Sequence, residues 1–211
     1  MATGAGGTQA LEAVVLAAGT GSRFGGGKLL APFRDGVLLD GALAAAFAGP
    51  VRDVWVVTGA DAEAVGDAAR AFADRTGESE RLRLVHATEH AEGMGASLRT
   101  AIAALPADAA GAFVFLGDMP RVPLAVLPQL ADALSAGAPA AAPAWQGRRG
   151  NPVLLGRPLF SRLLALTGDQ GARAVLQALG DRLALVDAPD DGVLFDVDER
   201  GDLNAVIPDG R

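Results

Sequence analysis

Three groups of residues in this sequence could together hold an anionic ligand and a metal ion. The segment from Gly19 to Lys28 contains five glycines and two cations, Asp118 follows an apolar run, and Asp196 and Asp198 lie two residues apart. Glycines let backbone N–H groups approach and surround an anion. Carboxylates combined with phosphate oxygens are the ligands that Mg²⁺ prefers. The three groups therefore predict a site for magnesium and a phosphorylated ligand.

The charge of the whole chain restricts how such a ligand is bound. The formal net charge is −7 and the pI is about 4.8. An acidic protein does not attract the phosphate backbone of nucleic acid by bulk electrostatics, so we expect no nucleic-acid partner. Phosphate binding must instead depend on a few placed cations, for which Arg23 and Lys28 are the candidates, or on a metal ion.

The bulk composition predicts one domain in the cytoplasm. The 211 residues are 50% hydrophobic, which is enough for one generous core and too short for two ordinary domains. No apolar run reaches the roughly 18 residues that span a bilayer, and residues 1–10 lack the pattern of a secretory signal. There is no cysteine, which excludes disulfides and thiolate metal sites. We expect a frayed segment at 1–10 and a single domain over 11–207, with no membrane partner.

Apolar runs and helical patterns alternate along the chain. Short apolar runs predict strands at 14–18, 54–57, 82–85, 112–116, 140–143, 153–155, 183–186 and 193–197. Helical spacing and stop signals predict helices at 38–48, 62–73, 95–105, 123–134, 159–166 and 172–179. The alternation predicts a Rossmann-like α/β fold, a three-layer sandwich with a mostly parallel sheet covered on both faces. Ligands bind beyond the carboxyl ends of such strands, which directs attention to the loops after Ala18, Leu116 and Val197.

Two familiar phosphate-binding loops do not match the glycine-rich segment. A Walker loop, GxxxxGK[ST], would require a hydroxyl side chain where Leu29 follows Lys28. The dinucleotide fingerprint GxGxxG would begin at Gly19 but meets Phe24 where its third glycine belongs. Without further motifs the segment could also be a flexible surface loop. A functional interpretation therefore requires a different kind of phosphate loop.

The segment LAAGTGSRFGGGKLL, residues 16–30, resembles the LAAGxSxRxGxxK signature of nucleotidyltransferases, most closely the molybdenum cofactor cytidylyltransferase branch. It departs from the signature in having Gly21 before Ser22 and three glycines before Lys28. The resemblance implies that Arg23 and Lys28 act on the triphosphate. It implies nucleotide binding by Leu16, Ala17, Ala18, Gly19, Thr20, Gly21, Ser22, Gly25 and Lys28.

The aspartates match two further motifs of the same family. Residues 117–120 read GDMP, in which the family's aspartate is a metal ligand, so Asp118 is the expected catalytic ligand; on position alone it could equally cap a helix. Residues 196–203 keep part of the family's late DIDTPEDL motif, with Glu199-Arg200-Gly201 in place of TPE. On an extended strand Asp196 and Asp198 would face one ion together with Asp118, although a solvated acidic strand end is the alternative. We expect Asp202 to cap the last helix.

Three remaining polar segments complete the resemblance, whose motifs occur in order from Leu16 to Leu203. The first, around Gly93, Met94 and Ser97, resembles a GM-x-x-SL segment that lines the nucleotide base and sugar; unaided, it would be an ordinary capped helix. The other two resemble GxRGxPV and GDxGAR and imply contacts from Arg149, Asn151 and Arg173 to the acceptor. We expect His86 and His90 to have a surface or loop-packing role and not to form a metal pair.

The resemblance implies Mg²⁺-dependent transfer of a nucleotidyl group from an NTP to a phosphorylated acceptor, with release of pyrophosphate. Ala18 favours CTP and a molybdopterin acceptor, because the guanylyl branch tends to have glycine there. The partners would be the nucleotide, the acceptor and a possible molybdoenzyme client. Guanylyl transfer, transfer to a sugar or alditol phosphate, and a non-catalytic cofactor-delivery protein stay open. A nicotinamide oxidoreductase is disfavoured by the missing glycine.

Overall fold

The computed structural model describes residues 10–168 and 171–206. Most of the segment expected to be frayed, residues 1–9, and the expected end of the domain at 207 lie outside this part. Asp169 and Gln170 of the GDxGAR-like segment also lie outside it. Within the described ranges, no helix is long and apolar enough to cross a membrane.

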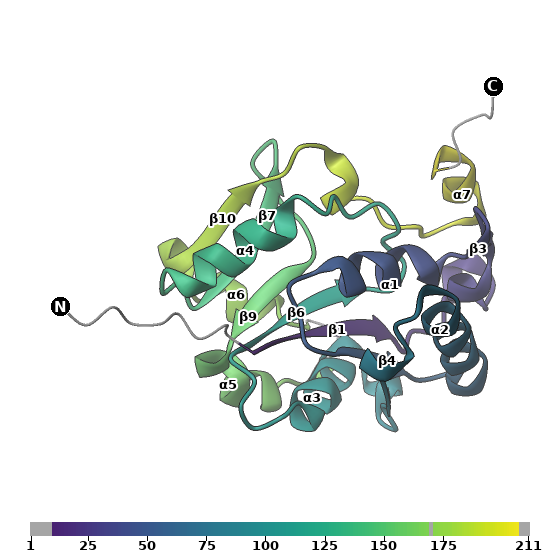
Figure 1. Cartoon of the computed structure of the whole chain (residues 1–211), viewed down its shortest axis with the longest axis horizontal. Helices are drawn as coiled ribbons and strands as arrows, with labels where there is room; N and C mark the ends of the chain where they lie inside the picture. Colours follow the sequence, from purple (N-terminus) through teal and green to yellow (C-terminus); the bar gives the residue numbers. More distant parts are fainter. Residues whose placement is uncertain (1–9, 169–170, 207–211) are drawn as a thin grey trace.

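An eight-stranded mixed sheet forms the centre of the molecule (Figure 1), and a two-stranded hairpin accompanies it. The strands are β1 (Leu11–Ala17), β2 (Pro32–Phe33), β3 (Gly36–Val37), β4 (Val54–Thr58), β5 (Leu82–His86), β6 (Gly111–Leu116), β7 (Ala140–Trp145), β8 (Arg148–Arg149), β9 (Val153–Gly156) and β10 (Leu183–Asp187). The main path runs β10-β7-β9-β6-β1-β4-β5, with β8 beside β7, and β2 pairs with β3. Within the large sheet β9 and β8 are antiparallel to their neighbours, and the remaining strands are parallel. The predicted mostly parallel sheet is confirmed.

Helices cover both faces of this sheet, as the sequence predicts. They are α1 (Leu39–Ala48), α2 (Ala62–Thr76), α3 (Met94–Ala104), α4 (Val126–Ser135), α5 (Phe160–Leu164), α6 (Arg173–Gln177) and α7 (Arg200–Val206). Short 3-10 turns occur at Ser22–Phe24, Lys28–Leu30, Ser79–Arg81, His90–Glu92, Arg157–Leu159, Gly180–Arg182 and Asp191–Val193. Figure 1 shows α1 and α4 on one side of the sheet and α3 and α5 on the other.

Alternation along β1 explains the two cores. Ala13 and Val15 pack with α1, α2 and α4, whereas Val14 packs with α3, α5 and α6. Successive side chains of a strand point to opposite faces, so a strand covered on both faces has apolar residues at almost every position. The three-layer arrangement follows directly from this continuous apolar pattern.

The strand order places two loops side by side at the carboxyl edge of the sheet. The chain passes from β1 outward to β4 and β5, and then returns to add β6 on the other side of β1. The amide of Gly117, just after β6, donates to the carbonyl of Leu16 near the end of β1 at 3.0 Å. This is a topological switch point, the place where open α/β sheets bind ligands. The glycine-rich loop begins there, and so does the loop that carries Asp118.

The structure corrects four details of the predicted elements. The strand predicted at 193–197 is wrong: the segment is a 3-10 turn followed by irregular chain. Val193 and Val197 are fully buried, but their backbone hydrogen bonds are made with loops. The Asn151 amide donates to the Val193 carbonyl, and the Val197 amide donates to the Asp118 carbonyl. The helix predicted from 123 begins at Val126, and α2 continues to Thr76. The hairpin of β2 and β3 was not predicted.

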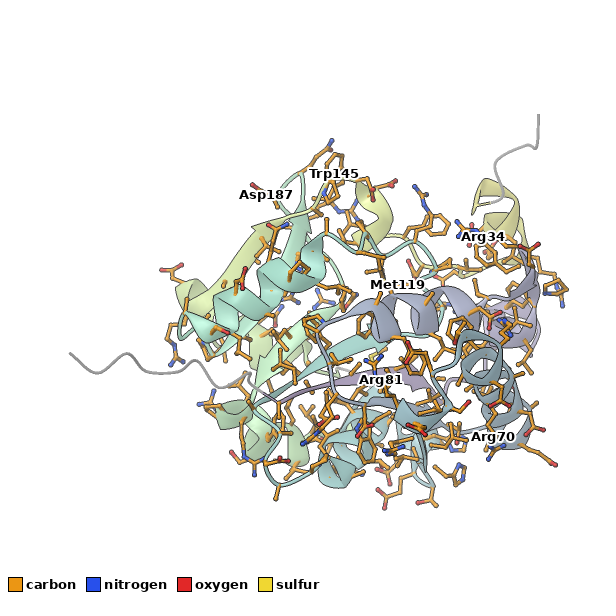
Figure 2. The ribbon with its side chains drawn as sticks, in the orientation of Figure 1. Arg34, Arg70, Arg81, Met119, Trp145 and Asp187 are labelled. Carbon is orange, nitrogen blue, oxygen red and sulfur yellow. The ribbon has the colours of Figure 1, made fainter. Side chains whose placement is uncertain are left out.

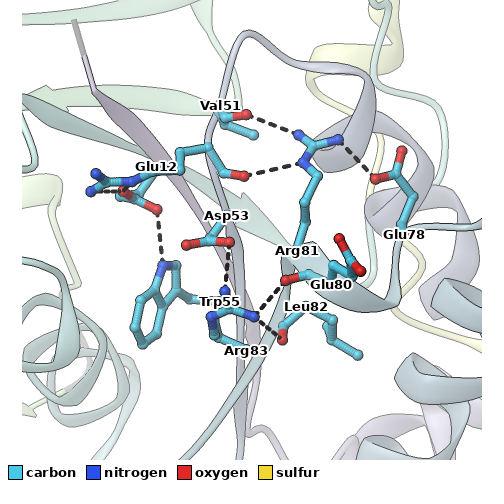
Figure 3. A network of polar contacts seen from close by, with 10 residues as sticks. Glu12, Val51, Asp53, Trp55, Glu78, Glu80, Arg81, Leu82 and Arg83 are labelled. Atoms are coloured by element: carbon cyan, nitrogen blue, oxygen red, sulfur yellow. Dashed lines mark hydrogen bonds and ion pairs between the residues drawn. The ribbon is translucent and has the colours of Figure 1, made fainter.

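A polar network lies at the opposite, amino edge of the sheet (Figure 3). Glu12 of β1 is fully buried and accepts hydrogen bonds from Arg52 Nε at 2.8 Å and from Trp55 Nε1 at 3.0 Å. Arg52 also donates to Asp108 through both terminal nitrogens at 2.9 Å, which raises the pKa of Arg52 and lowers that of Asp108. A buried carboxylate that is paired in this way anchors the first strand between its neighbours.

Candidate active site

The glycine-rich loop adopts a conformation that glycine alone tolerates well. Gly21 and Gly27 have φ values of 59° and 61°, in the left-handed region. A Cβ atom at Gly21 would also lie 2.9 Å from Cβ of Lys28, so the loop can return the lysine to the strand end only with glycine there. Across the described part of the chain, the five amides from Gly19 to Arg23 donate to no acceptor. The loop therefore offers N–H groups to an anion.

Phe24 fixes the outer half of the loop. Its side chain is 4% exposed and packs in a small core with Ala31, Phe33, Leu38 and Val197. The Arg200 guanidinium lies 4.7 Å from the centre of the Phe24 ring, a cation–π contact. Ser22 and Gly25, which were predicted to bind nucleotide, belong to the tight turn around Phe24 and do not line the cavity described below.

One ion cluster brings together two predicted cations, Arg23 and Lys28, and two predicted carboxylates, Asp118 and Asp198. Lys28 Nζ lies 2.6 Å from Asp118 Oδ2 and 3.9 Å from Asp198 Oδ1. Arg23 Nη1 lies 3.2 Å from Asp198 Oδ2. The Lys28 and Asp118 side chains are 13% and 23% exposed, whereas Arg23 is 77% exposed. The loop after β1, the loop after β6 and the segment before α7 therefore converge at this cluster.

The segment before α7 is held in place by backbone contacts. The Val197 amide donates to the carbonyl of Asp118 at 3.1 Å, which joins the two acidic segments. The Asp202 carboxylate accepts from the amides of Asp198 at 2.9 Å and Glu199 at 2.8 Å. These two bonds lower the pKa of Asp202, whose carboxylate reaches back from the first turn of α7 and caps the amides that precede the helix, the capping role expected of it.

Asp196 is linked to the cluster by charge and not by direct contact. Its pKa is raised by partial burial and by the negative charges of Asp118 and Asp198. Among the residues that the structure describes, no three acidic or histidine side chains are gathered tightly enough to hold one ion. The loss of the predicted strand explains this, because Asp196 and Asp198 do not share the regular alternation of an extended ladder. The carboxylates that form ion pairs with Lys28 belong to Asp118 and Asp198.

Two carboxylates suit a hard divalent cation. Mg²⁺ and similar ions bind proteins through one or two carboxylates and take their other ligands from phosphates and water. Asp118 and Asp198 converge on a single ammonium group, so a cation in the same region would have both within reach. The donor set of Asp118 and Asp198 therefore fits such an ion.

A cavity of about 500 Å³ opens beside this cluster. Its walls are Leu16, Ala17, Ala18, Gly19, Thr20, Gly21, Lys28, Leu29, His90, Ala91, Gly93, Met94, Ser97, Leu116 and Asp118. All the predicted nucleotide-binding residues except Ser22 and Gly25 are among them. Ser97 is 4% exposed and lies in the first turn of α3. The chain after β4 passes close to Ala18 in the cavity wall. Glycine is needed at position 59 for this contact, because a Cβ atom there would collide with the backbone of Ala18.

A second cavity of about 600 Å³ adjoins the first, and the two share Leu16, Met94 and Leu116. The predicted acceptor residues Arg149, Asn151 and Arg173 all line it. Its other walls are Leu98, Val114, Gly150, Val153, Ala172, Leu176 and Gln177. The lining thus combines apolar side chains from strands and helices with the cations Arg149 and Arg173.

Sequence reasoning missed several cavity residues. His90 was expected to pack in a loop; its Nδ1 atom does lie 3.0 Å from the Ala87 carbonyl oxygen, but the residue also lines the first cavity. Gln177 lines the second cavity from the last turn of α6. Only the positions of the 3-10 turn His90–Glu92 and of α6 relative to β1 and β6 reveal these contacts, although the motif around Gly93 could have directed attention to His90.

A doubly covered sheet, a glycine-rich loop at its switch point and carboxylates facing that loop define a nucleotide-binding α/β enzyme of the nucleotidyltransferase class. The chain belongs to the family of MobA-like NTP transferase domains, whose model matches residues 13–183. The predicted fold and enzyme class are therefore confirmed.

Two kinds of relative illustrate the similarity. The chain is 23% identical over 194 residues to the molybdenum cofactor cytidylyltransferase of Escherichia coli (strain K12), covering 92% of this chain and 94% of that protein. The crystal structure of Rv0371c from Mycobacterium tuberculosis H37Rv superimposes with a TM-score of 0.79 at 26% identity, covering 95% of this chain and 98% of that one. A complex of the same Mycobacterium tuberculosis protein with manganese gives a TM-score of 0.69 at 25% identity, over 85% and 88% of the two chains.

Proposed function

We propose that this enzyme transfers a cytidylyl group from CTP to the terminal phosphate of a molybdopterin-type cofactor, with a divalent cation, and releases pyrophosphate. The observation that carries the proposal is the pair of adjoining cavities. One has the glycine-rich loop, Lys28 and Asp118 in its wall, and the other has Arg149 and Arg173. A nucleotide in the first and a phosphorylated acceptor in the second would meet at the shared residues Leu16, Met94 and Leu116.

The expected chemistry is a single displacement at phosphorus. An oxygen of the acceptor phosphate forms a bond to the α-phosphorus of CTP, and the bond from that phosphorus to the bridging oxygen breaks, so pyrophosphate leaves with the electron pair. Such a reaction depends on positioning and charge neutralisation rather than on covalent catalysis. A divalent cation bound there would neutralise charge on the phosphates as the bond breaks.

Each part of the cluster has a separate role in this proposal. The amides from Gly19 to Arg23 would bind phosphate oxygens, and Lys28 and Arg23 would balance the charge of the departing pyrophosphate. Asp118 with Asp198 would hold the metal. Arg149 and Arg173 would hold the acceptor phosphate in line for attack.

Two observations support the choice of substrates. Ala18 lines the nucleotide cavity, and the cytidylyl branch has alanine at this position where the guanylyl branch tends to have glycine. The Escherichia coli relative is named as a molybdenum cofactor cytidylyltransferase. The Mycobacterium tuberculosis protein was crystallised as a complex with manganese, which supports a divalent cation for this enzyme. The apolar side chains that line the second cavity would suit a flat ring system attached to the phosphate.

The test is a direct comparison of nucleotides. The protein is incubated with molybdopterin cofactor, Mg²⁺ and CTP, GTP, ATP or UTP, and pyrophosphate release is measured with and without EDTA. We expect release with CTP and Mg²⁺, at a value of kcat/KM well above that for GTP. A preference for GTP would replace the cytidylyl assignment by a guanylyl one. Tight cofactor binding with no pyrophosphate from any nucleotide would favour a delivery protein instead.

Replacing Arg149 or Arg173 by alanine should raise the KM for the acceptor about tenfold or more, because each removes a charge-assisted hydrogen bond to its phosphate. The KM for CTP should stay near its wild-type value, since neither residue lines the first cavity. Initial rates at varied acceptor and fixed CTP provide the measurement. Arg162→Ala, on the exposed surface of α5 and outside both cavities, is the matched control. Equal effects on both KM values would contradict the assignment.

A further inference from the structure

The ions of the active site neutralise one another in this structure. Lys28 is paired with Asp118 at 2.6 Å and lies 3.9 Å from Asp198, which is itself paired with Arg23 at 3.2 Å. The cluster thus contains two cations that the proposed function assigns to the triphosphate and two carboxylates that it assigns to the metal. Each cation has a carboxylate as its partner, so neither set is free to receive its ligand.

From these pairs we infer that the metal ion and the nucleotide must bind together, by exchanging partners with the protein. The inference rests on the proposed function and adds how the site is controlled. A divalent cation that binds Asp118 must displace Lys28 from it. A triphosphate that binds Lys28 must in turn leave the Asp118 carboxylate without the lysine as its counter-ion. When both ligands arrive, the carboxylates pass to the metal and the cations pass to the phosphates.

Burial makes either half of this exchange unfavourable by itself. The Lys28 side chain is 13% exposed and that of Asp118 is 23% exposed, so neither is well solvated after losing its partner. A partly buried charge without a counter-ion is costly, whereas a pair that is replaced by another pair is not. The Arg23–Asp198 pair is more exposed, at 77% and 49%, and should contribute less to the coupling. Lys28 and Asp118 are therefore the principal pair.

The exchange predicts that removing one partner of the Lys28–Asp118 pair increases the affinity of the remaining partner for its own ligand, and the experiment measures this increase. In Lys28→Met the carboxylates lose their cation, so free Mn²⁺ should bind more tightly than to the wild-type protein, by roughly 5- to 150-fold, the usual range of coupling between sites. In Asp118→Asn the lysine loses its anion, so CTP in the presence of EDTA should bind more tightly by a factor in the same range. Electron paramagnetic resonance of free Mn²⁺ and calorimetry with CTP measure the two affinities without any turnover.

Arg34→Met is the matched control for the change of net charge. Arg34 is exposed on the hairpin between β2 and β3 (Figure 2), its guanidinium lies 5.1 Å from the Phe33 ring, and it is not among the cations paired with Asp118 and Asp198. We expect Arg34→Met to leave the affinity for Mn²⁺ within about twofold of the wild-type value, as for exposed charges screened by salt. A gain equal to that of Lys28→Met would assign the effect to net charge and would overturn the inference.

Circular dichroism establishes that each variant is folded, and Lys28→Gln repeats the test if Lys28→Met is not. Folded Lys28 and Asp118 variants that show no gain for the opposite ligand would overturn the exchange. This outcome differs from failure of the proposed function. If the gains appear but no nucleotide gives pyrophosphate, the exchange stands and the reaction is wrong; if turnover appears without the gains, the reaction stands and the exchange is wrong.

Discussion

Replacing Asp118 by asparagine is expected to reduce turnover by about a thousandfold or more, equivalent to about 4 kcal/mol of transition-state stabilisation. Asp118 supplies the carboxylate nearest to Lys28, at the carboxyl end of β6, where the nucleotide cavity meets the ion cluster. An amide at this position keeps the shape of the side chain but cannot balance a divalent cation. Steady-state pyrophosphate release at saturating Mg²⁺, CTP and acceptor measures the loss.

Asp187→Asn is the control for this prediction. Asp187 is exposed at the end of β10 (Figure 2). Its replacement by asparagine removes one negative charge by the same chemical change as Asp118→Asn. We expect its turnover to remain close to the wild-type value. If Asp118→Asn retained wild-type turnover while remaining folded, Asp118 would not be a metal ligand in the reaction, and the assignment of the site would have to be abandoned.

The second large effect concerns stability. Glu12→Ala should lower the free energy of unfolding by about 2–4 kcal/mol, because it removes a buried acceptor and leaves the Trp55 indole N–H without a partner. Glu12 is fully buried and bonds both Arg52 and Trp55 (Figure 3). Urea denaturation followed by circular dichroism gives the difference. The value of kcat at 25 °C should change little, since this network lies at the edge of the sheet opposite the ion cluster.

Two other substitutions separate burial from charge in the same network. Glu12→Gln keeps an oxygen for the indole N–H, so it should be less destabilising than Glu12→Ala. Asp108→Asn removes the exposed partner of Arg52 and should be less destabilising still, because a solvent-exposed pair is screened by water and salt. A loss from Asp108→Asn as large as that from Glu12→Ala would show that the buried carboxylate has no special role.

The layered fold could be predicted because buried parallel strands have apolar residues on both faces. The runs at β1, β4 and β6 are apolar for this reason, and the glycines that end them mark the loops of the site. The same reasoning fails at 193–197, where Val193 and Val197 are buried against loops without joining a sheet. Hydrophobicity indicates burial, and only the hydrogen bonds of the folded backbone decide whether a buried segment is a strand.

The site was predicted in its components but not in its connections. Motif letters predicted phosphate and metal roles for Lys28, Asp118 and Asp198, yet they gave no reason to expect that these residues pair with one another. Such contacts depend on strand order and on the path of the segment before α7. The same limit applies to His90 and Gln177, since a cavity wall is defined by which elements lie next to each other.

The contact between Arg23 and Asp198 joins residues separated by 175 positions in the chain. During synthesis the first strand and its glycine-rich loop leave the ribosome long before Asp198 does, although a domain generally folds as a unit. A nascent chain that has already formed β1, β4 and β6 would still lack Val197 beneath Phe24 and one of the two carboxylates. The ion cluster therefore cannot be complete before Asp198 has been made, so a partly made chain would lack one of the two carboxylates of the site.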